Sequence, residues 1–138
     1  MPLTKERTGW RDERISQHHR KWGIGCTATD FDFLMLEYEY GNPSAIVEYK
    51  HENAPIQYPT NPQYQALIKL GDKAEIPVLA CRYSDDFTSY KVIPLNEYAR
   101  KIIPDRSELD EISWVKLLYK IRGREATPEF LEHMKIEI

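Results

Sequence analysis

The pattern of apolar and polar positions along the chain predicts two pairs of β-strands. Residues 30–40 are too rich in aromatic and branched side chains for a loop, and residues 45–50 have the same character. The turn-forming residues Gly-Asn-Pro-Ser separate them at 41–44, so we expect an antiparallel hairpin. Residues 76–83 and 89–95 predict a third and a fourth strand on either side of a polar turn.

Helices are predicted from capping residues and from the helical spacing of apolar positions. Asn61 followed by Pro62 is typical of a helix start, and Gly71 is expected at the end of that helix. Ser107 with Asp110 is similar to a capping box, which would begin a longer amphipathic helix. In all, the predicted helices span residues 5–22, 62–70, 97–103, 107–121 and a last segment from residue 128 onward.

The order of these elements, α-β-β-α-β-β, predicts an α/β fold with a mixed central sheet flanked by helices and with extra C-terminal helices. Because the first strand is apolar on both faces, we expect it to be central in the sheet and covered on both sides. The chain length suits one domain, residues 1–138, with a core over about residues 5–95 and a helical extension over about 96–138.

Composition and cysteine content exclude several classes of protein. Hydrophobic residues make up 41% of the chain and charged residues 30%, which is typical of globular proteins and not of disordered or fibrous ones. No stretch approaches the roughly 20 apolar residues that span a bilayer, so we expect no membrane partner and a cytoplasmic location. Cys26 and Cys81 lie far apart and outside any CxxC pattern, which excludes a disulfide-dense scaffold and the usual structural zinc site.

Charge is distributed unevenly along the chain. The formal net charge is -3, yet residues 1–25 carry six basic and three acidic side chains, a net +3, so the remaining residues carry -6. A basic segment of this kind indicates contact with an anion such as a nucleic-acid backbone. A solvated helix face explains the same charges equally well. The candidate nucleic-acid contacts are Arg11, Arg14, Arg20 and Lys21.

Ionisable side chains gather on one face of the predicted hairpin. With a turn centred near Asn42, even-numbered residues of both strands face the same side of the sheet. This places Asp32 close to Glu48 and within a diagonal step of Lys50. Two carboxylates in a buried sheet repel each other and lose solvation unless a cation neutralises them. A hard divalent ion such as Mg²⁺, held by the two carboxylates, a backbone carbonyl and water, would neutralise both.

Asp32, followed on the next strand by Glu48-Tyr49-Lys50, resembles the active-site motif of the PD-(D/E)XK nuclease superfamily. The resemblance covers about residues 5–95 and implies a restriction-endonuclease-like core. It implies catalytic roles for Asp32, Glu48 and Lys50. It also implies Mg²⁺, or Mn²⁺ in its place, bound by Asp32, Glu48 and the backbone carbonyl of Tyr49. The implied activity is metal-dependent hydrolysis of phosphodiester bonds in DNA.

Several alternatives stay open. Neither Asp30 nor Asp32 follows a proline, so either aspartate could be the metal ligand; Asp32 is preferred, with Asp30 as a supporting acid. Glu13, on the predicted first helix, is a further candidate acid. The chain could instead be a catalytically inactive module that binds nucleic acid or protein on the same fold, and the Glu-x-Lys residues could form a purely structural ion pair. RNA as the substrate and a homodimeric state also stay open.

Overall fold

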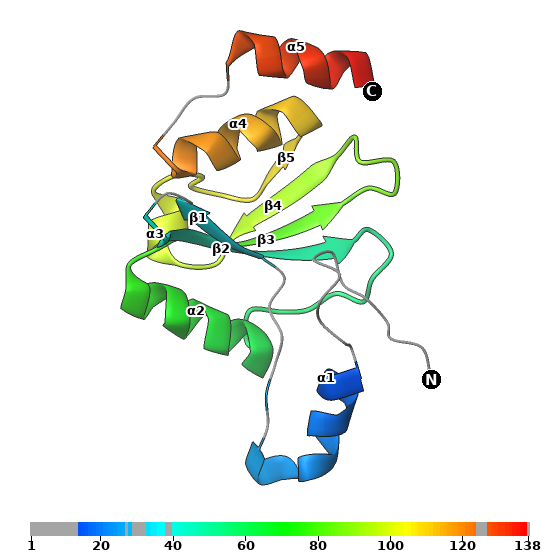
Figure 1. Ribbon diagram of the computed structural model, residues 1–138, viewed down its shortest axis with the longest axis vertical. Coiled ribbons are helices and arrows are strands. Elements are labelled where there is room, and N and C mark those ends of the chain that lie inside the picture. The colour runs from blue at the N-terminus through cyan, green and yellow to red at the C-terminus, as the bar shows by residue number, and fades with distance from the viewer. Residues whose placement is uncertain (1–13, 27, 29–32, 38–39, 124–126, 138) are drawn as a thin grey trace. The chain divides into compact units, whose positions relative to one another are not determined.

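The computed structural model describes residues 14–26, 28, 33–37, 40–123 and 127–137 (Figure 1). The chain divides into two compact units, Met1–Asp30 and Phe31–Ile138. In the first unit, α1 (Arg14–His19) is followed by two 3₁₀ turns, η1 (Arg20–Trp22) and η2 (Ile24–Cys26). The predicted helix end at residue 22 coincides with the end of η1, and Gly23 follows with a φ of 89°, a conformation that glycine adopts without steric cost.

The second unit is built on a five-stranded sheet (Figure 1). Its strands are β1 (Phe33–Glu37), β2 (Asn42–His51), β3 (Val78–Tyr83), β4 (Tyr90–Pro94) and β5 (Ser107–Leu109). They lie side by side in this same order. β2 and β3 are parallel, whereas the other neighbouring pairs are antiparallel. A helix, α2 (Pro62–Ala74), connects the two parallel strands, because a parallel pair needs a crossover connection.

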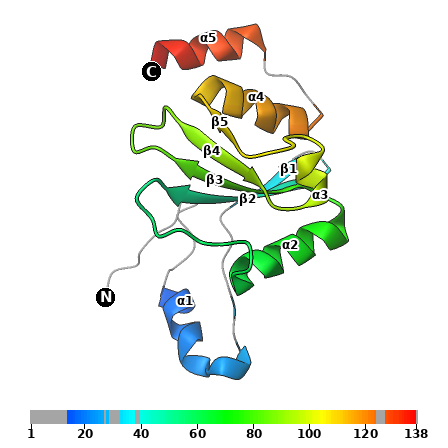
Figure 2. The ribbon, with the colours of Figure 1, turned by 180° about the vertical axis from the view of Figure 1, so that it is seen from behind.

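Helices cover both faces of this sheet, as Figures 1 and 2 show from opposite sides. α2 lies against one face, and α4 (Glu111–Ile121) lies against the other. The short α3 (Glu97–Arg100) follows β4, and α5 (Pro128–Glu137) contacts α4 through the rings of Phe130 and Tyr119. The expected α/β class, with a mixed sheet flanked by helices, is therefore confirmed. Among the described helices, none has the length and apolar character needed to cross a membrane.

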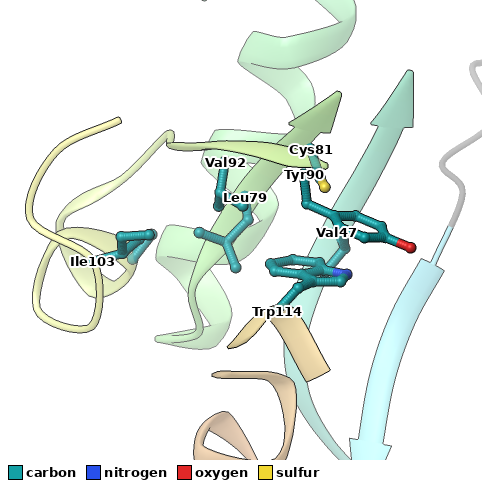
Figure 3. Packing of buried hydrophobic residues seen from close by; sticks show 8 residues of the cluster. Val47, Leu79, Cys81, Tyr90, Val92, Ile103 and Trp114 are labelled. Atoms are coloured by element: carbon teal, nitrogen blue, oxygen red, sulfur yellow. The ribbon is translucent and has the colours of Figure 1, made fainter. Parts of the chain in front are cut away.

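Two apolar clusters, one on each face of the sheet, make up the core of this unit. The cluster on the α4 side is shown in Figure 3, where the indole of Trp114 lies against side chains of β2, β3 and β4. The cluster on the α2 side contains Ile46 and Val78 from the sheet together with Tyr64 and Leu67 from the helix. Alternate residues of β2 and β3 therefore pack on opposite faces, so the two strands are buried on both sides.

The predicted central position of the first strand is wrong. β1 lies at an edge of the sheet among the described residues, with β2 as its neighbour. Its Phe33 and Met35 pack against the core on the α4 side, but Leu34 and Leu36 are 42% and 40% exposed. An apolar pattern on both faces of a strand is therefore not enough to place that strand in the middle of a sheet.

The predicted end of the second helix at Gly71 is also wrong. α2 continues to Ala74, and the residue that ends it is Glu75, whose φ of 58° is left-handed. Gly71 is buried inside the helix, where an added Cβ would overlap the Cγ2 of Val78. The glycine is needed here because the helix passes close to the start of β3, not because the helix ends.

The segment after residue 95 contains more than helices. Ser107 belongs to β5, which the sequence pattern does not predict because the strand has only three residues. The α4 helix begins later than expected, with Asp110 as the cap that accepts a hydrogen bond from the Ser113 amide at 2.7 Å. This segment also supplies Trp114 to the core. It therefore adds both a strand to the sheet and a side chain to the core.

Candidate functional site

Glu48 and Lys50 of β2 lie together, as the sequence predicts. They are two residues apart on one strand, so they face the same side of the sheet as Ile46, the side that α2 covers. The Nζ of Lys50 lies 3.5 Å from the Oε1 of Glu48. Only 2% of the Glu48 side chain is exposed, against 26% of Lys50. The pair therefore consists of a buried carboxylate with an ammonium group at the edge of the solvent.

This arrangement determines what the pair can do. A buried carboxylate loses its hydration and is stable as an anion only where cations or hydrogen-bond donors compensate for that loss. Lys50 supplies one positive charge at 3.5 Å. Its partial exposure leaves the ammonium group accessible to a ligand arriving from solvent. Glu48 offers carboxylate oxygens, the donor type that Mg²⁺ prefers.

Tyr49, between the two charged residues, points to the opposite face of the sheet. Its hydroxyl accepts a hydrogen bond from the Nε1 of Trp114 at 3.2 Å. Its ring makes edge contacts with the rings of Phe33 and Tyr83. The phenol is thus part of the core, and the backbone is the only part of Tyr49 that can belong to a site on the Glu48 face.

Asp32, Asp30 and Glu13, together with the predicted nucleic-acid contact Arg11, lie outside the described residues. Within the described residues, no three His, Cys, Asp or Glu side chains are grouped so that they could hold a metal ion. Of the predicted metal ligands, the described part of the chain contains the Glu48 carboxylate and the Tyr49 carbonyl.

Arg82 of β3 lies directly opposite Lys50 and holds the segment that follows β2. Its Nη1 donates hydrogen bonds to three carbonyl oxygens, of His51 at 3.0 Å, Glu52 at 3.2 Å and Ala54 at 2.8 Å, and its Nη2 donates to that of Pro55 at 3.4 Å. One side chain therefore binds four carbonyls, of the last residue of β2 and of three residues in the loop that follows it. The sequence pattern does not identify this residue, because the contact joins strands that are distant in sequence.

His51, at the end of β2, ties the same segment to the turn between β3 and β4. Its Nδ1 accepts a hydrogen bond from the Asn53 amide at 3.1 Å, so its Nε2 is the donor to the Oδ1 of Asp85 at 3.0 Å. The carboxylate of Glu52 accepts a hydrogen bond from the Asp85 amide at 2.8 Å. Polar contacts thus hold the segment that follows β2 against the turn between β3 and β4.

The turn between β3 and β4 is itself ordered by one carboxylate. Hydrogen bonds from the side chains of Thr88 and Ser84 to Asp86 hold the pKa of that carboxyl below its usual value. The same carboxylate also accepts a hydrogen bond from the Thr88 amide at 3.2 Å. Because these donors come from both sides of the turn, the turn presents a defined surface next to the end of β2.

A polar hollow of about 370 Å³ opens at this end of the sheet. The row of paired residues that begins with Lys50 and Arg82 continues through Lys91 of β4 to Glu108 of β5, so these four side chains share one face. Ser89 donates a hydrogen bond from its Oγ to the Oε1 of Glu108 at 2.8 Å. The lining residues are Glu52, Asn53, Arg82, Ser84, Ser89, Lys91 and Glu108.

The remaining predicted nucleic-acid contacts lie in the first unit. Arg14 begins α1, and Arg20 and Lys21 are in η1. All three are exposed. Trp22 packs its ring against those of His18 and His19, with centroids 5.7 and 4.7 Å away. This unit therefore presents basic side chains around a small aromatic cluster.

Comparison of the chain with models of known families, with curated proteins and with solved structures finds no match.

Proposed function

We propose that this chain is a metal-dependent nuclease that hydrolyses phosphodiester bonds in DNA through Asp32, Glu48 and Lys50, on a restriction-endonuclease-like core. One observation carries the proposal: a carboxylate that is 2% exposed has a lysine ammonium 3.5 Å away, and the lysine is open to solvent. A protein that needed only a surface ion pair would have no reason to bury the acid, because exposed pairs contribute about 0–1 kcal/mol and burial of one partner adds a desolvation cost.

The register of the hairpin supports the inclusion of Asp32. β1 and β2 pair Leu34 with Ile46 and Phe33 with Val47. Asp32 precedes Phe33 in the sequence, and Glu48 follows Val47. If the antiparallel ladder continues by one more residue, we expect Asp32 to lie opposite Glu48, on the face that Glu48 shares with Lys50. Two carboxylates and a backbone carbonyl are a sufficient protein donor set for Mg²⁺, which keeps several waters.

Each residue then has a distinct role. When bound, Mg²⁺ or Mn²⁺ would act as a Lewis acid on a phosphate oxygen and lower the pKa of bound water. Asp32 and Glu48 provide oxygen ligands. Lys50 holds a positive charge where negative charge develops on the phosphate, and its ammonium group can donate hydrogen bonds to a phosphate oxygen. Arg82 acts indirectly, because it fixes the backbone that follows Lys50.

Cleavage of supercoiled DNA in the presence of Mg²⁺ or Mn²⁺ tests the proposal. We expect Glu48→Gln, which keeps the shape of the side chain, to lower the cleavage rate by roughly 100-fold or more, since it removes a charged oxygen ligand. Lys50→Ala should have a similar effect, and a chelator should abolish cleavage by the unaltered protein. Nicked and linear products resolved on agarose gels give the rates.

Glu97→Gln is the matched control, because Glu97 is an exposed acid on α3 that pairs with Arg100. It should cleave at the rate of the unaltered protein. Circular dichroism should show that Glu48→Gln keeps the fold. Undiminished cleavage by folded Glu48→Gln, purified free of host nucleases, would contradict the proposed assignment.

A catalytically inactive module that binds nucleic acid or protein is the second candidate. It is favoured by the ion pair itself, because Lys50 at 3.5 Å can compensate Glu48 without a metal ion. Calorimetric titration with Mn²⁺ separates the two candidates. Heat of binding that disappears in Glu48→Gln supports the nuclease, whereas a protein that binds DNA but takes up no metal ion supports the inactive module.

A further inference from the structure

Three cationic side chains lie directly opposite one another on three adjacent strands. Lys50 of β2 is in register with Arg82 of β3, and Arg82 is in register with Lys91 of β4. Directly opposed residues of neighbouring strands share a face of the sheet, and like charges in such positions destabilise it. This cationic row, Lys50–Arg82–Lys91, therefore needs a compensating anion or a functional reason to persist.

Carboxylates of the described residues compensate only one end of the cationic row. Lys50 has Glu48 at 3.5 Å. Glu108 faces Lys91 in register, but its Oε1 accepts a hydrogen bond from Ser89, and no carboxylate in the described part of the chain lies within 4.0 Å of the Lys91 ammonium or the Arg82 guanidinium. The hydrogen bonds of Arg82 go to neutral carbonyls, so they leave its positive charge without a compensating anion among the described residues.

The far end of the row is open to a ligand. Arg82 and Lys91 line the polar hollow of about 370 Å³ beside the β3–β4 turn. Lys91 is exposed, and neighbouring strands are about 4.8 Å apart, so the row extends about 10 Å from Lys50. A DNA strand carries one phosphate per roughly 3.4 Å of helix rise, and consecutive phosphates lie farther apart than this along the strand itself, so a row of this length can meet more than one phosphate of one strand.

We propose that the cationic row carries the phosphate backbone of one DNA strand across the sheet, from the Glu48–Lys50 pair to the polar hollow. This inference rests on the proposed nuclease function and adds the path of the substrate strand. Lys91 binds a phosphate at the far end of the path. Glu108 continues the row beyond Lys91, so its carboxylate repels an anion and sets the far end of the path.

Binding of a fluorescent 20-nucleotide DNA strand, measured by anisotropy in chelator over a range of salt concentrations, tests this path. We expect Lys91→Ala to bind about two- to fivefold more weakly at low salt. The slope of log K against log[salt] should fall by about 0.7 in magnitude, the value for loss of one contact to a single strand. Lys116→Ala, which removes an exposed lysine from α4 on the opposite side of the sheet, should bind as the unaltered protein does.

The inference is overturned if the salt slope is unchanged in Lys91→Ala or falls equally in Lys116→Ala. It is also overturned if binding by the unaltered protein is undetectable at 50 mM salt. Oligoglutamate that competes for the protein with the same dependence on Lys91 would assign the row to an acidic protein partner instead. Binding is measured in chelator, where the proposed metal-dependent cleavage is not expected. This measurement is therefore independent of the Glu48→Gln cleavage assay, and either proposal can fail alone.

Discussion

A single side chain, Asn96, joins three elements of the second unit. Its Oδ1 accepts hydrogen bonds from the Val78 amide at 3.0 Å and the Ala99 amide at 2.9 Å. Its Nδ2 donates to the Oδ1 of Asp72 at 3.0 Å and to the carbonyl of Ile76 at 2.9 Å. Asn96 therefore caps α3 while it fixes the start of β3 against the end of α2. The cap depends on neighbouring residues only, whereas the contacts with α2 and β3 depend on the fold.

Substitution Asn96→Asp should strongly destabilise the protein. It keeps the acceptor but replaces the Nδ2 donor by an oxygen that faces two other acceptors, at a site that is 2% exposed. Opposed acceptors and an uncompensated buried charge lower the free energy of unfolding, here by about 2–4 kcal/mol at pH 7. Urea unfolding measures the difference. Asn42→Ala, at an exposed position at the start of β2, should change it by less than about 0.5 kcal/mol.

The same contrast between local and distant contacts divides the candidate site. Glu48 and Lys50 are predictable because strand alternation alone places them on one face. Arg82 and Lys91 are not, because their positions beside Lys50 depend on which later strands pair with β2 and in which register. Single-sequence periodicity contains no information on that pairing. The role of Asp32 stays a prediction, since the residue lies outside the described part of the chain.

At the scale of elements, close packing of α2 against β3 depends on Gly71. A Cβ at this position would overlap the Cγ2 of Val78 and come within 3.2 Å of the Ile76 carbonyl oxygen. The helix therefore has to move away from the sheet, or β3 has to shift, if any other residue replaces the glycine.

Substitution Gly71→Ala should consequently destabilise the protein, although alanine is the better helix former by up to about 1 kcal/mol. Overpacking of a buried contact costs about 1–3 kcal/mol, so we expect a net decrease in the free energy of unfolding. Urea unfolding tests the sign. Lys73→Ala, at an exposed position of the same helix, should have an effect within about 0.5 kcal/mol, and a more stable Gly71→Ala protein would contradict the packing argument.

Most elements of the second unit are predictable because their signals are local. The Asn61 and Asn96 caps and the start of α5 after Thr127 depend on neighbouring residues. The predicted hairpin turn at 41–44 is placed too late, because residues 42–44 already belong to β2, where Asn42 and Pro43 pair with β1. The predictions from sequence fail where tertiary contacts determine the structure. Gly71 is inside a helix because of β3, β1 is an edge strand because no further strand pairs with it among the described residues, and the three-residue β5 exists because β4 pairs with it.

At the scale of the whole molecule, two buried acids of the core resist ionisation. Burial raises the pKa of the Cys81 thiol from 9.0 to about 12. Burial and the nearby Glu111 carboxylate raise the pKa of the Tyr90 hydroxyl above its usual value of 10.0. Both groups contact the cluster on the α4 side, so their protonated forms are part of the native packing.

The free energy of unfolding should therefore decrease at alkaline pH. The folded state holds the Cys81 proton more tightly than the unfolded chain does, so this contribution is fully present below pH 9 and is lost as pH rises toward 12. In that window one thiol lowers the free energy of unfolding by up to about 1.4 kcal/mol per pH unit, and Tyr90 adds to the slope above pH 10. Urea unfolding from pH 7 to 11 measures the slope.

The Cys81→Ala variant is the control for this pH dependence. It should be less stable at pH 7, because the core loses a buried group, but its stability should change less between pH 9 and pH 10. An identical slope in the two proteins over this interval would show that Cys81 titrates in the folded state as it does in the unfolded chain.

The one parallel pairing in the sheet affects how the candidate site forms during folding. β1 and β2 form one antiparallel ribbon and β3 to β5 form another, and β2 pairs with β3 only across the long connection of residues 52–77. Glu48 and Lys50 belong to the first ribbon, whereas Arg82 and Lys91 belong to the second. A partly folded chain in which each ribbon has closed but the two have not yet met would therefore carry only separate halves of the site.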